Sequence, residues 1–210
     1  MLDENFRNEY LQITPAGAYY ATVSSEPDDA RALLLQLLSA EIALPYSEEL
    51  IEELTDLEPE PASELFSKLR QKGFLELNEN PIVVVDEVVE KMLPELLPLL
   101  SNTGRVALAD DQGFCLGSSG FDDSHAEALS ALAADVISLH ERHLPLLNRE
   151  LSFSGESWGM LDPIGQSQVG FWVVHMGSQK FMLIVDEMPK LNQQAFVNLL
   201  SVLARRYLDY

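Results

Sequence analysis

The sequence has a single cysteine and no long apolar run. Because Cys115 is the only cysteine among 210 residues, no disulfide can form within the chain, which is typical of a reducing compartment. No uninterrupted apolar segment reaches the roughly 18 residues that a membrane-spanning helix needs. The first ten residues are acidic and lack the apolar region of a signal peptide. These absences predict a cytoplasmic protein without a membrane segment.

Basic side chains are also scarce. The chain carries 13 Lys and Arg residues against 34 Asp and Glu residues, which gives a net charge of −21. The first hundred residues hold 6 of the basic and 21 of the acidic residues, so the acidity is concentrated there. A field of this sign repels phosphate backbones and anionic membrane surfaces. The composition therefore argues against binding to nucleic acid or to membranes.

A hydrophobic content of 47% is that of a folded protein, and the length allows one large or two small domains. Helix signals include Ser47 as an N-cap before two acids, Pro61 in a first turn and Gly73 as a C-cap. A return strand is expected after the turn at 78–81. The first part is predicted to contain strands at 10–13 and 18–23 around a turn at 15–17, helices at 27–40, 47–54 and 61–72, and strands at 74–77 and 82–85.

Three short helices followed by a hairpin are typical of winged-helix domains. The stretch LFSKLRQKGFLELNENP resembles the recognition helix and wing of that family. The resemblance implies a small α+β domain at residues 1–85, on which Lys68, Arg70 and Lys72 would contact DNA or a protein. Three basic residues in so acidic a region make a poor footprint for DNA. A transcription regulator with a C-terminal dimerisation or sensor domain is thus the alternative function.

The second part alternates helices and strands in a different order. A turn at 110–113 closes a hairpin over 105–118. Pro94 is expected to bend or restart the helix that precedes this hairpin. Predicted elements are helices at 86–100, 122–144 and 191–207, and further strands at 151–153, 157–161, 169–175 and 181–185. This order predicts a five-stranded antiparallel sheet with flanking helices, in a domain of residues 86–210.

The D-x-x-G hairpin at 110–113, the Ser-Ser-Gly exit at 118–120 and the alanine-rich helix after it resemble the roadblock / dynein light chain family over residues 86–208. The resemblance implies a profilin-like α+β fold. It also implies homodimers or heterodimers, often with Ras-like small GTPases that these proteins regulate or scaffold. Bacterial members of the family include partners of a polarity GTPase.

The helix around 126–139 is apolar around most of its circumference. A helix that covers one sheet needs an apolar stripe only about 100° wide. We therefore predict that its second side packs against the same helix of a second subunit across a two-fold axis. The alternative is that alanine is simply a good helix former on a solvated face. The predicted dimer residues are Ala126, Leu129, Leu132, Ala133, Val136 and Ile137.

Four motifs suggest chemistry, and each has a simpler interpretation. Gly155–Gly159 matches the G-x-S-x-G nucleophile motif, with Asp162 and His175 after it, but no helix can follow Ser157 as that motif requires. His140 and His143 are three apart, whereas the zinc-protease helix places them four apart.

The glycines of 117–120 lack the lysine of a phosphate-binding loop, and Cys115 has no neighbouring base in sequence. We therefore predict no catalytic, metal-binding or cofactor-binding residues. The expected function is that of a non-enzymatic interaction protein: a homodimeric scaffold that binds a small GTPase or another protein.

Overall fold

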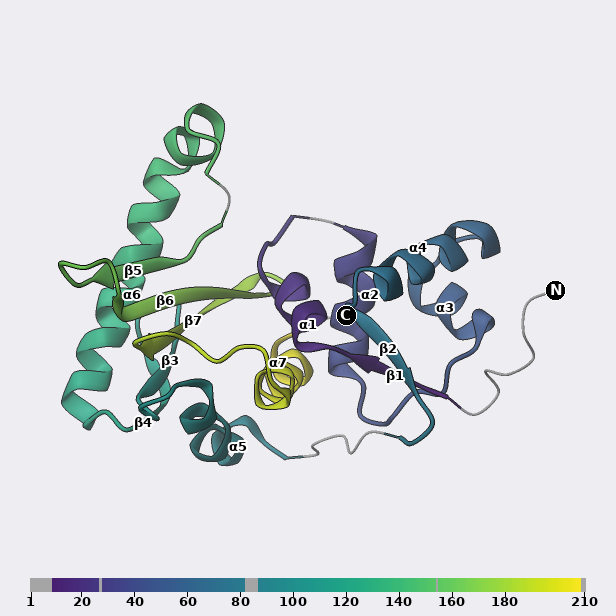
Figure 1. Cartoon of the computed structure of the whole chain (residues 1–210), viewed down its shortest axis with the longest axis horizontal. Helices are drawn as coiled ribbons and strands as arrows, with labels where there is room; N and C mark the ends of the chain where they lie inside the picture. Colours follow the sequence, from purple (N-terminus) through teal and green to yellow (C-terminus); the bar gives the residue numbers. More distant parts are fainter. Residues whose placement is uncertain (1–8, 27, 82–86, 154, 209–210) are drawn as a thin grey trace. The chain divides into compact units, whose positions relative to one another are not determined.

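The computed structural model describes residues 9–26, 28–81, 87–153 and 155–208 (Figure 1). The described residues form two compact units. The sheet unit comprises residues 23–25 and 88–191, and the helical unit comprises the described residues of 1–22, 26–87 and 192–210. Each unit is considered separately below.

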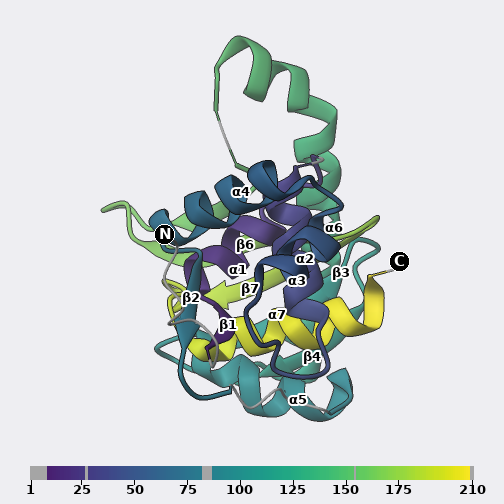
Figure 2. The ribbon, with the colours of Figure 1, turned by 90° about the vertical axis from the view of Figure 1, so that its right-hand side faces the viewer.

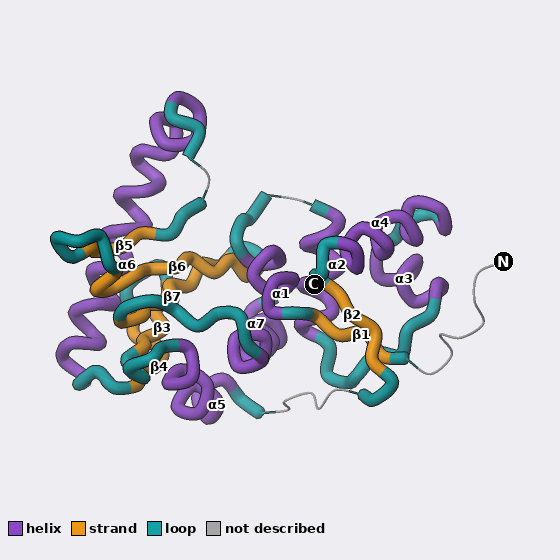
Figure 3. The backbone as a smooth tube through the Cα atoms, in the orientation of Figure 1, coloured by secondary structure: helices purple, strands orange, loops and turns teal. Residues whose placement is uncertain are grey.

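The sheet unit is built on a five-stranded antiparallel sheet in the order β4-β3-β7-β6-β5 (Figure 3). Its strands are β3 (Val106–Asp110), β4 (Cys115–Ser119), β5 (Trp158–Leu161), β6 (Ser167–Met176) and β7 (Gln179–Asp186). The middle strand β7 reads Phe-Met-Leu-Ile-Val over 181–185 and is buried on both faces. Such a continuous apolar run is what a strand covered on both faces requires. The predicted α+β fold is therefore confirmed.

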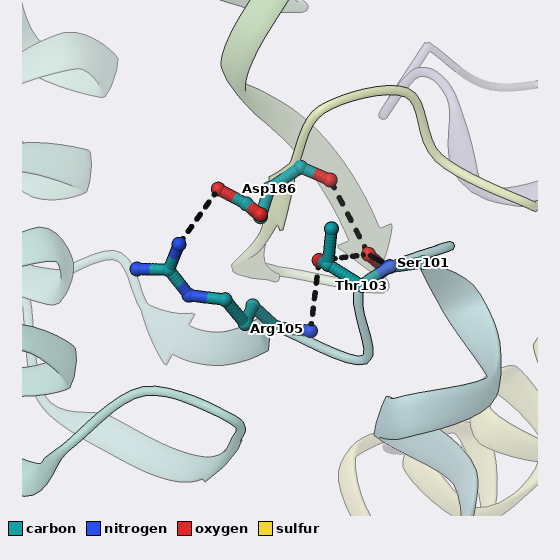
Figure 4. A network of polar contacts seen from close by, with 4 residues as sticks. All are labelled: Ser101, Thr103, Arg105 and Asp186. Carbon is teal, nitrogen blue, oxygen red and sulfur yellow. Dashed lines mark hydrogen bonds and ion pairs between the residues drawn. The ribbon is translucent and has the colours of Figure 1, made fainter.

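Polar contacts join the start of β3 to the end of β7. The Ser101 hydroxyl donates to the Asp186 carbonyl oxygen at 3.3 Å, and the Arg105 guanidinium lies 3.4 Å from the Asp186 carboxylate (Figure 4). Thr103 bonds to the Ser101 hydroxyl and accepts from the Arg105 amide. These contacts set the register of β3 beside β7, where Val106 pairs with Val185.

Two helices of the sheet unit are α5 (Val89–Leu96) and α6 (Asp123–Leu144). Pro94 lies inside α5, which ends two residues later and continues as the 3₁₀ turn Leu97–Leu100, as expected for an interior proline. The N-cap of α6 is Asp122, whose carboxylate accepts from the His125 backbone N–H at 2.9 Å. This bond lowers the pKa of Asp122. The predicted helix at 122–144 is thus confirmed.

The helical unit confirms the three predicted helices. Its elements are β1 (Tyr10–Ile13), α1 (Pro15–Thr22), α2 (Asp29–Ser39), α3 (Glu48–Thr55), α4 (Pro59–Gln71), β2 (Leu75–Asn78) and α7 (Gln194–Tyr207). Strands β1 and β2 pair antiparallel. The predicted return strand at 82–85 lies outside the described residues.

A strand predicted at 18–23 is wrong, because residues 15–22 form α1. The Thr14 hydroxyl accepts from the Gly17 backbone N–H at 3.1 Å, which is the bond of an N-cap. Pro15 then occupies the first helical position, where its missing N–H has no consequence. Pro15 and Gly17 therefore start a helix here instead of forming the expected turn.

The last helix packs against other elements than those that the sequence predicts. Residues 86–210 were expected to form one domain, but α7 packs against α1 and α2 of the helical unit. Eight of its fourteen residues are buried. The second predicted domain thus shares its final helix with the first part of the chain.

Candidate interaction surface

The inner face of α6 covers the sheet of its own chain. Five buried positions follow one another three or four residues apart: Ala126, Ser130, Ala133, Ile137 and His140. Ala133 and Ile137 belong to the core cluster with Ala107, Ala109, Phe171, Met182 and Ile184. This spacing is that of a single helix face. Helix α6 therefore packs on the sheet along this face.

Three of the six predicted dimer residues lie on this inner face. Ala126, Ala133 and Ile137 are almost completely buried within the chain, so their side chains are not available to a second subunit. The sequence could not separate them from the outer residues because alanine and isoleucine suit either environment. These three residues do not face a second subunit, because the sheet of their own chain already covers this side of the helix.

A second apolar stripe runs along one flank of α6. Leu129 and Val136 are half-buried beside the core cluster, and Leu132 and Leu139 are 41% and 40% exposed. We call these four residues the outer stripe. Their spacing of three, four and three residues is that of a seam between two helices. Of the predicted dimer residues, Leu129, Leu132 and Val136 belong to it.

The opposite flank of α6 is covered by the β3–β4 turn. A Cβ atom added to Gly113, in this turn, would lie 3.1 Å from the Ala131 Cα atom and 3.3 Å from the Ala134 Cβ atom. Gly113 has a φ of +89°, which a side chain rarely adopts, and its lack of one permits this close approach. The predicted role of Gly113 in the turn is confirmed. The large apolar side chains that α6 leaves exposed are Leu132 and Leu139 of the outer stripe, and Leu144 at the C-terminal end of the helix.

Strand β5 ends the sheet next to this helix, and among the described strands it is hydrogen-bonded to β6 alone. The Trp158 indole N–H donates to His140 Nδ1 of α6 at 3.3 Å, so Trp158 lies on the face of the sheet that α6 covers. Because residues two apart in a strand share a face, Met160 lies on that side as well, and it is exposed. An unpaired strand edge with exposed apolar side chains is a common site of pairing with another chain.

Two buried histidines hold β5 and the residues before it. His140 and His175 are 5% and 3% exposed, and His175 Nε2 lies 3.1 Å from the Glu156 carboxylate. The hydrogen bond from His175 lowers the pKa of Glu156, and burial opposes this shift. The sequence did not predict the pairing of His175 with Glu156.

We expect the Glu156–His175 pair to make stability depend on pH. Because the pKa of Glu156 is lowered on folding from its ordinary value of 4.5, the pair stabilises the fold above that pH. This stabilisation is lost as the pH falls through the lowered pKa. Thermal unfolding between pH 7 and pH 3 should show a smaller loss of Tm in Glu156→Gln than in the wild type. Equal losses in both proteins would contradict this assignment.

The nucleophile motif does not assemble into a triad. Ser157 precedes an edge strand, and Asp162 lies in the β5–β6 turn, where its carboxylate accepts from the backbone N–H groups of Ile164 and Gln166. Asp162 lies before the first residue of the ten-residue strand β6, and His175 lies near the last. At about 3.3 Å per residue, the strand separates Asp162 from His175 by some 25 Å. The arrangement therefore lacks the serine, histidine and acid contacts of a hydrolase.

The other motif residues have structural surroundings. A Cβ atom on Gly117 would lie 2.7 Å from Leu93 of α5, and Gly120 has a φ of +69° beside Arg105, so both glycines serve packing and the turn into α6. His140 is buried over the sheet, whereas His143, one turn further along α6, is exposed. Among the described residues, no group of three or more His, Cys, Asp or Glu side chains is placed to hold a metal ion. Cys115 is half-buried in β4.

The basic cluster lies on the exposed side of α4. Lys68 pairs with Glu64 at 3.3 Å on the same helix. The Arg70 guanidinium lies 5.9 Å from the centre of the Phe66 ring, and the Lys72 ammonium lies at that distance from the Phe74 ring. These neighbours come from the chain itself, and contact of the three basic residues with DNA or a protein stays a prediction. In the described part of the chain, no helix is long and apolar enough to cross a membrane.

Comparison with known proteins finds structural similarity alone. The chain is similar to a Roadblock/LC7 domain from Streptomyces avermitilis, with a TM-score of 0.36 and 13% identity, over 57% of this chain and 93% of that chain. It is also similar to Myxococcus xanthus MglB, with a TM-score of 0.33 and 15% identity, over 60% of this chain and 90% of that chain. No protein-family model and no curated protein sequence matches the chain. The matched portion is C-terminal, where the sequence resembles the roadblock family, and the winged-helix interpretation is not confirmed.

Proposed function

We propose that this protein is a non-enzymatic, homodimeric scaffold of the roadblock type that binds and regulates a partner protein. The observation that carries the proposal is the outer stripe of α6, which leaves Leu132 and Leu139 exposed beside the open edge of β5. A second copy related by a two-fold axis would cover both features at once, since such an interface uses the same patch on each subunit.

The proposed interface combines two contacts, one between the outer stripes of the two α6 helices and one between the edges of the two β5 strands. In the proposed dimer, the two α6 helices pack along their outer stripes and bury the leucines that one subunit leaves in water. Because Leu132 and Leu139 are only 41% and 40% exposed in the single chain, covering each of them contributes about 1 kcal/mol. The two β5 strands pair alongside and satisfy backbone groups that the edge leaves open. Met160 of β5 is exposed and adds apolar area at this strand.

The proposed partner is a Ras-like small GTPase, as the resemblance to the roadblock family implies. This part of the proposal is tested separately from the dimer. The oligomeric state is measured by sedimentation velocity from 0.1 to 50 micromolar, where a dimer is expected and a monomer throughout would contradict the proposal. A purified Ras-like GTPase is then assayed for binding and for GTP hydrolysis. Binding without a change in hydrolysis would support a scaffold instead of a regulator.

A further inference from the structure

Beyond the sheet, α6 continues into a projecting segment that we call the arm, residues 142–153. The C-terminal end of α6 and the π-helical turn Pro145–Glu150 extend past β5 in Figure 1, and the same segment projects at the top of Figure 2. The return segment is folded back on this turn by hydrogen bonds from the backbone N–H groups of Leu151 and Phe153 to the carbonyl oxygens of Leu146 and Leu147. The arm exposes four large apolar side chains: Leu144, Leu146, Leu151 and Phe153.

The base of the arm is fastened to the sheet where the chain leaves and where it returns. On the outgoing side, Glu141 of α6 forms an ion pair with Lys180 of β7. On the returning side, Glu156 bonds to buried His175 of β6, and Trp158 bonds to buried His140. These contacts hold the arm in one direction relative to the sheet. The exposed apolar groups are thus presented on a supported projection.

The outer stripe continues into the arm with the same spacing. Leu132, Leu139 and Leu146 are each seven residues apart, and His143 continues the series of Leu129 and Val136. Positions alternating by three and four residues are the a and d positions of a helix pair. The seam is therefore longer than the part of α6 that lies over the sheet, and it ends on the arm. This continuity favours a second copy of the chain as the molecule that covers the arm.

Charge decides how the second copy is oriented. Asp122 and His125 extend the same seven-residue pattern to the N-terminal end of α6, where Asp123 adds a second carboxylate. In a parallel pair, the aspartates of the two copies would lie side by side. In an antiparallel pair centred on Ala134, His143 and Leu146 lie opposite His125 and Asp122 of the second copy. The antiparallel pair therefore avoids the repulsion between like charges.

We propose that, in the dimer described above, the arm of each copy docks on the connection between β4 and α6 of the other copy. There, Arg149 lies next to the carboxylates of Asp122 and Asp123, and Leu146 and Phe153 cover half-buried Phe121. Within its own chain, Phe121 has the Arg105 guanidinium 4.7 Å from its ring centre. The inference rests on the proposed dimer, and it adds a second, reciprocal contact at each end of the helix pair.

Cross-linking tests the position of the arm. Cys115 is replaced by Ser throughout, Arg149→Cys is introduced in one tagged copy, and Ser124→Cys is introduced in a copy with a different tag. A short bis-maleimide is expected to join the two tags in the mixed sample. The matched control is Asp111→Cys in the β3–β4 turn, on the covered flank of α6, which should not cross-link to residue 149. No product with residue 124, or equal products with both, would overturn the proposal.

Affinity measurements separate this inference from the proposed dimer. The double variant Leu146→Asp/Phe153→Asp is expected to weaken dimerisation at least tenfold in sedimentation equilibrium, with the far-UV circular dichroism unchanged. If Leu132→Asp dissociates the dimer and the arm variant leaves it unchanged, the arm contact alone is overturned. The arm would then be assigned to a different protein. A wild-type monomer would overturn both proposals.

Discussion

Replacing Leu132 with aspartate is expected to convert the dimer into monomers. Leu132 lies at the middle of the outer stripe and is 41% exposed in the single chain, so a carboxylate there is tolerated by the monomer. In the dimer, the two-fold axis brings the introduced charges of both copies into one apolar seam. Burying a charge without a partner costs several kcal/mol, so the dissociation constant should rise more than a hundredfold.

Sedimentation velocity at 10 micromolar measures this change as a shift of the main boundary from dimer to monomer. The control is Ser138→Asp, which adds the same charge to an exposed position of the same helix, away from the outer stripe. The control should remain dimeric. If both variants remain dimeric, the outer stripe is not the interface, and the observation that carries the proposed function is lost.

Replacing Ile137 with alanine is expected to lower the free energy of unfolding by about 2–4 kcal/mol. Ile137 is 6% exposed and packs in the core cluster with Phe171 and Ile184, so the substitution leaves a cavity between α6 and the sheet. The sequence predicted a dimer contact for this residue. The structure instead makes it part of the core, which changes the expected result from a loss of association to a loss of stability.

This experiment is best done in the Leu132→Asp background, where dimerisation does not contribute to stability. Urea unfolding followed by circular dichroism gives the free energy. Leu139→Ala serves as the matched control, because Leu139 is 40% exposed on the same helix and should cost less than 1 kcal/mol in the monomer. Equal losses for the two variants would mean that the inner and outer faces of α6 have been assigned wrongly.

The two faces of α6 show where prediction from sequence stops. The all-round apolar pattern predicted a helix buried on two sides. The structure shows burial on the side that faces the sheet, and burial of the other side by a second subunit stays a prediction, with three of the six predicted residues on the outer stripe. Which residues face which side depends on where the β3–β4 turn and the sheet contact the helix. Gly113 against Ala131 and Phe171 against Ile137 are neighbours only after the chain has folded.

The arm was missed for a related reason. Residues 151–153 were predicted as a strand because Leu151 and Phe153 are apolar in an alternating pattern. The structure places them in the return segment after the π-helical turn, where hydrogen bonds from their backbone N–H groups go to the turn itself. Local alternation does not show whether a sheet has a free edge for the segment to join. The seven-residue spacing from Leu132 to Leu146 was present in the sequence and could have indicated the extended seam.

Apart from the strand expected at 151–153, the sequence by itself determined the order of the strands and helices of the sheet unit, the turn at 110–113 and the effect of Pro94. These depend on local hydrogen bonds, backbone conformation and side-chain periodicity, which neighbouring residues specify. Only the tertiary structure decided that α7 packs with α1 and α2, that Glu156 pairs with His175, and that β5 is an open edge beside the outer stripe. Those features join residues far apart in the chain, and many arrangements of the same elements satisfy the same local preferences.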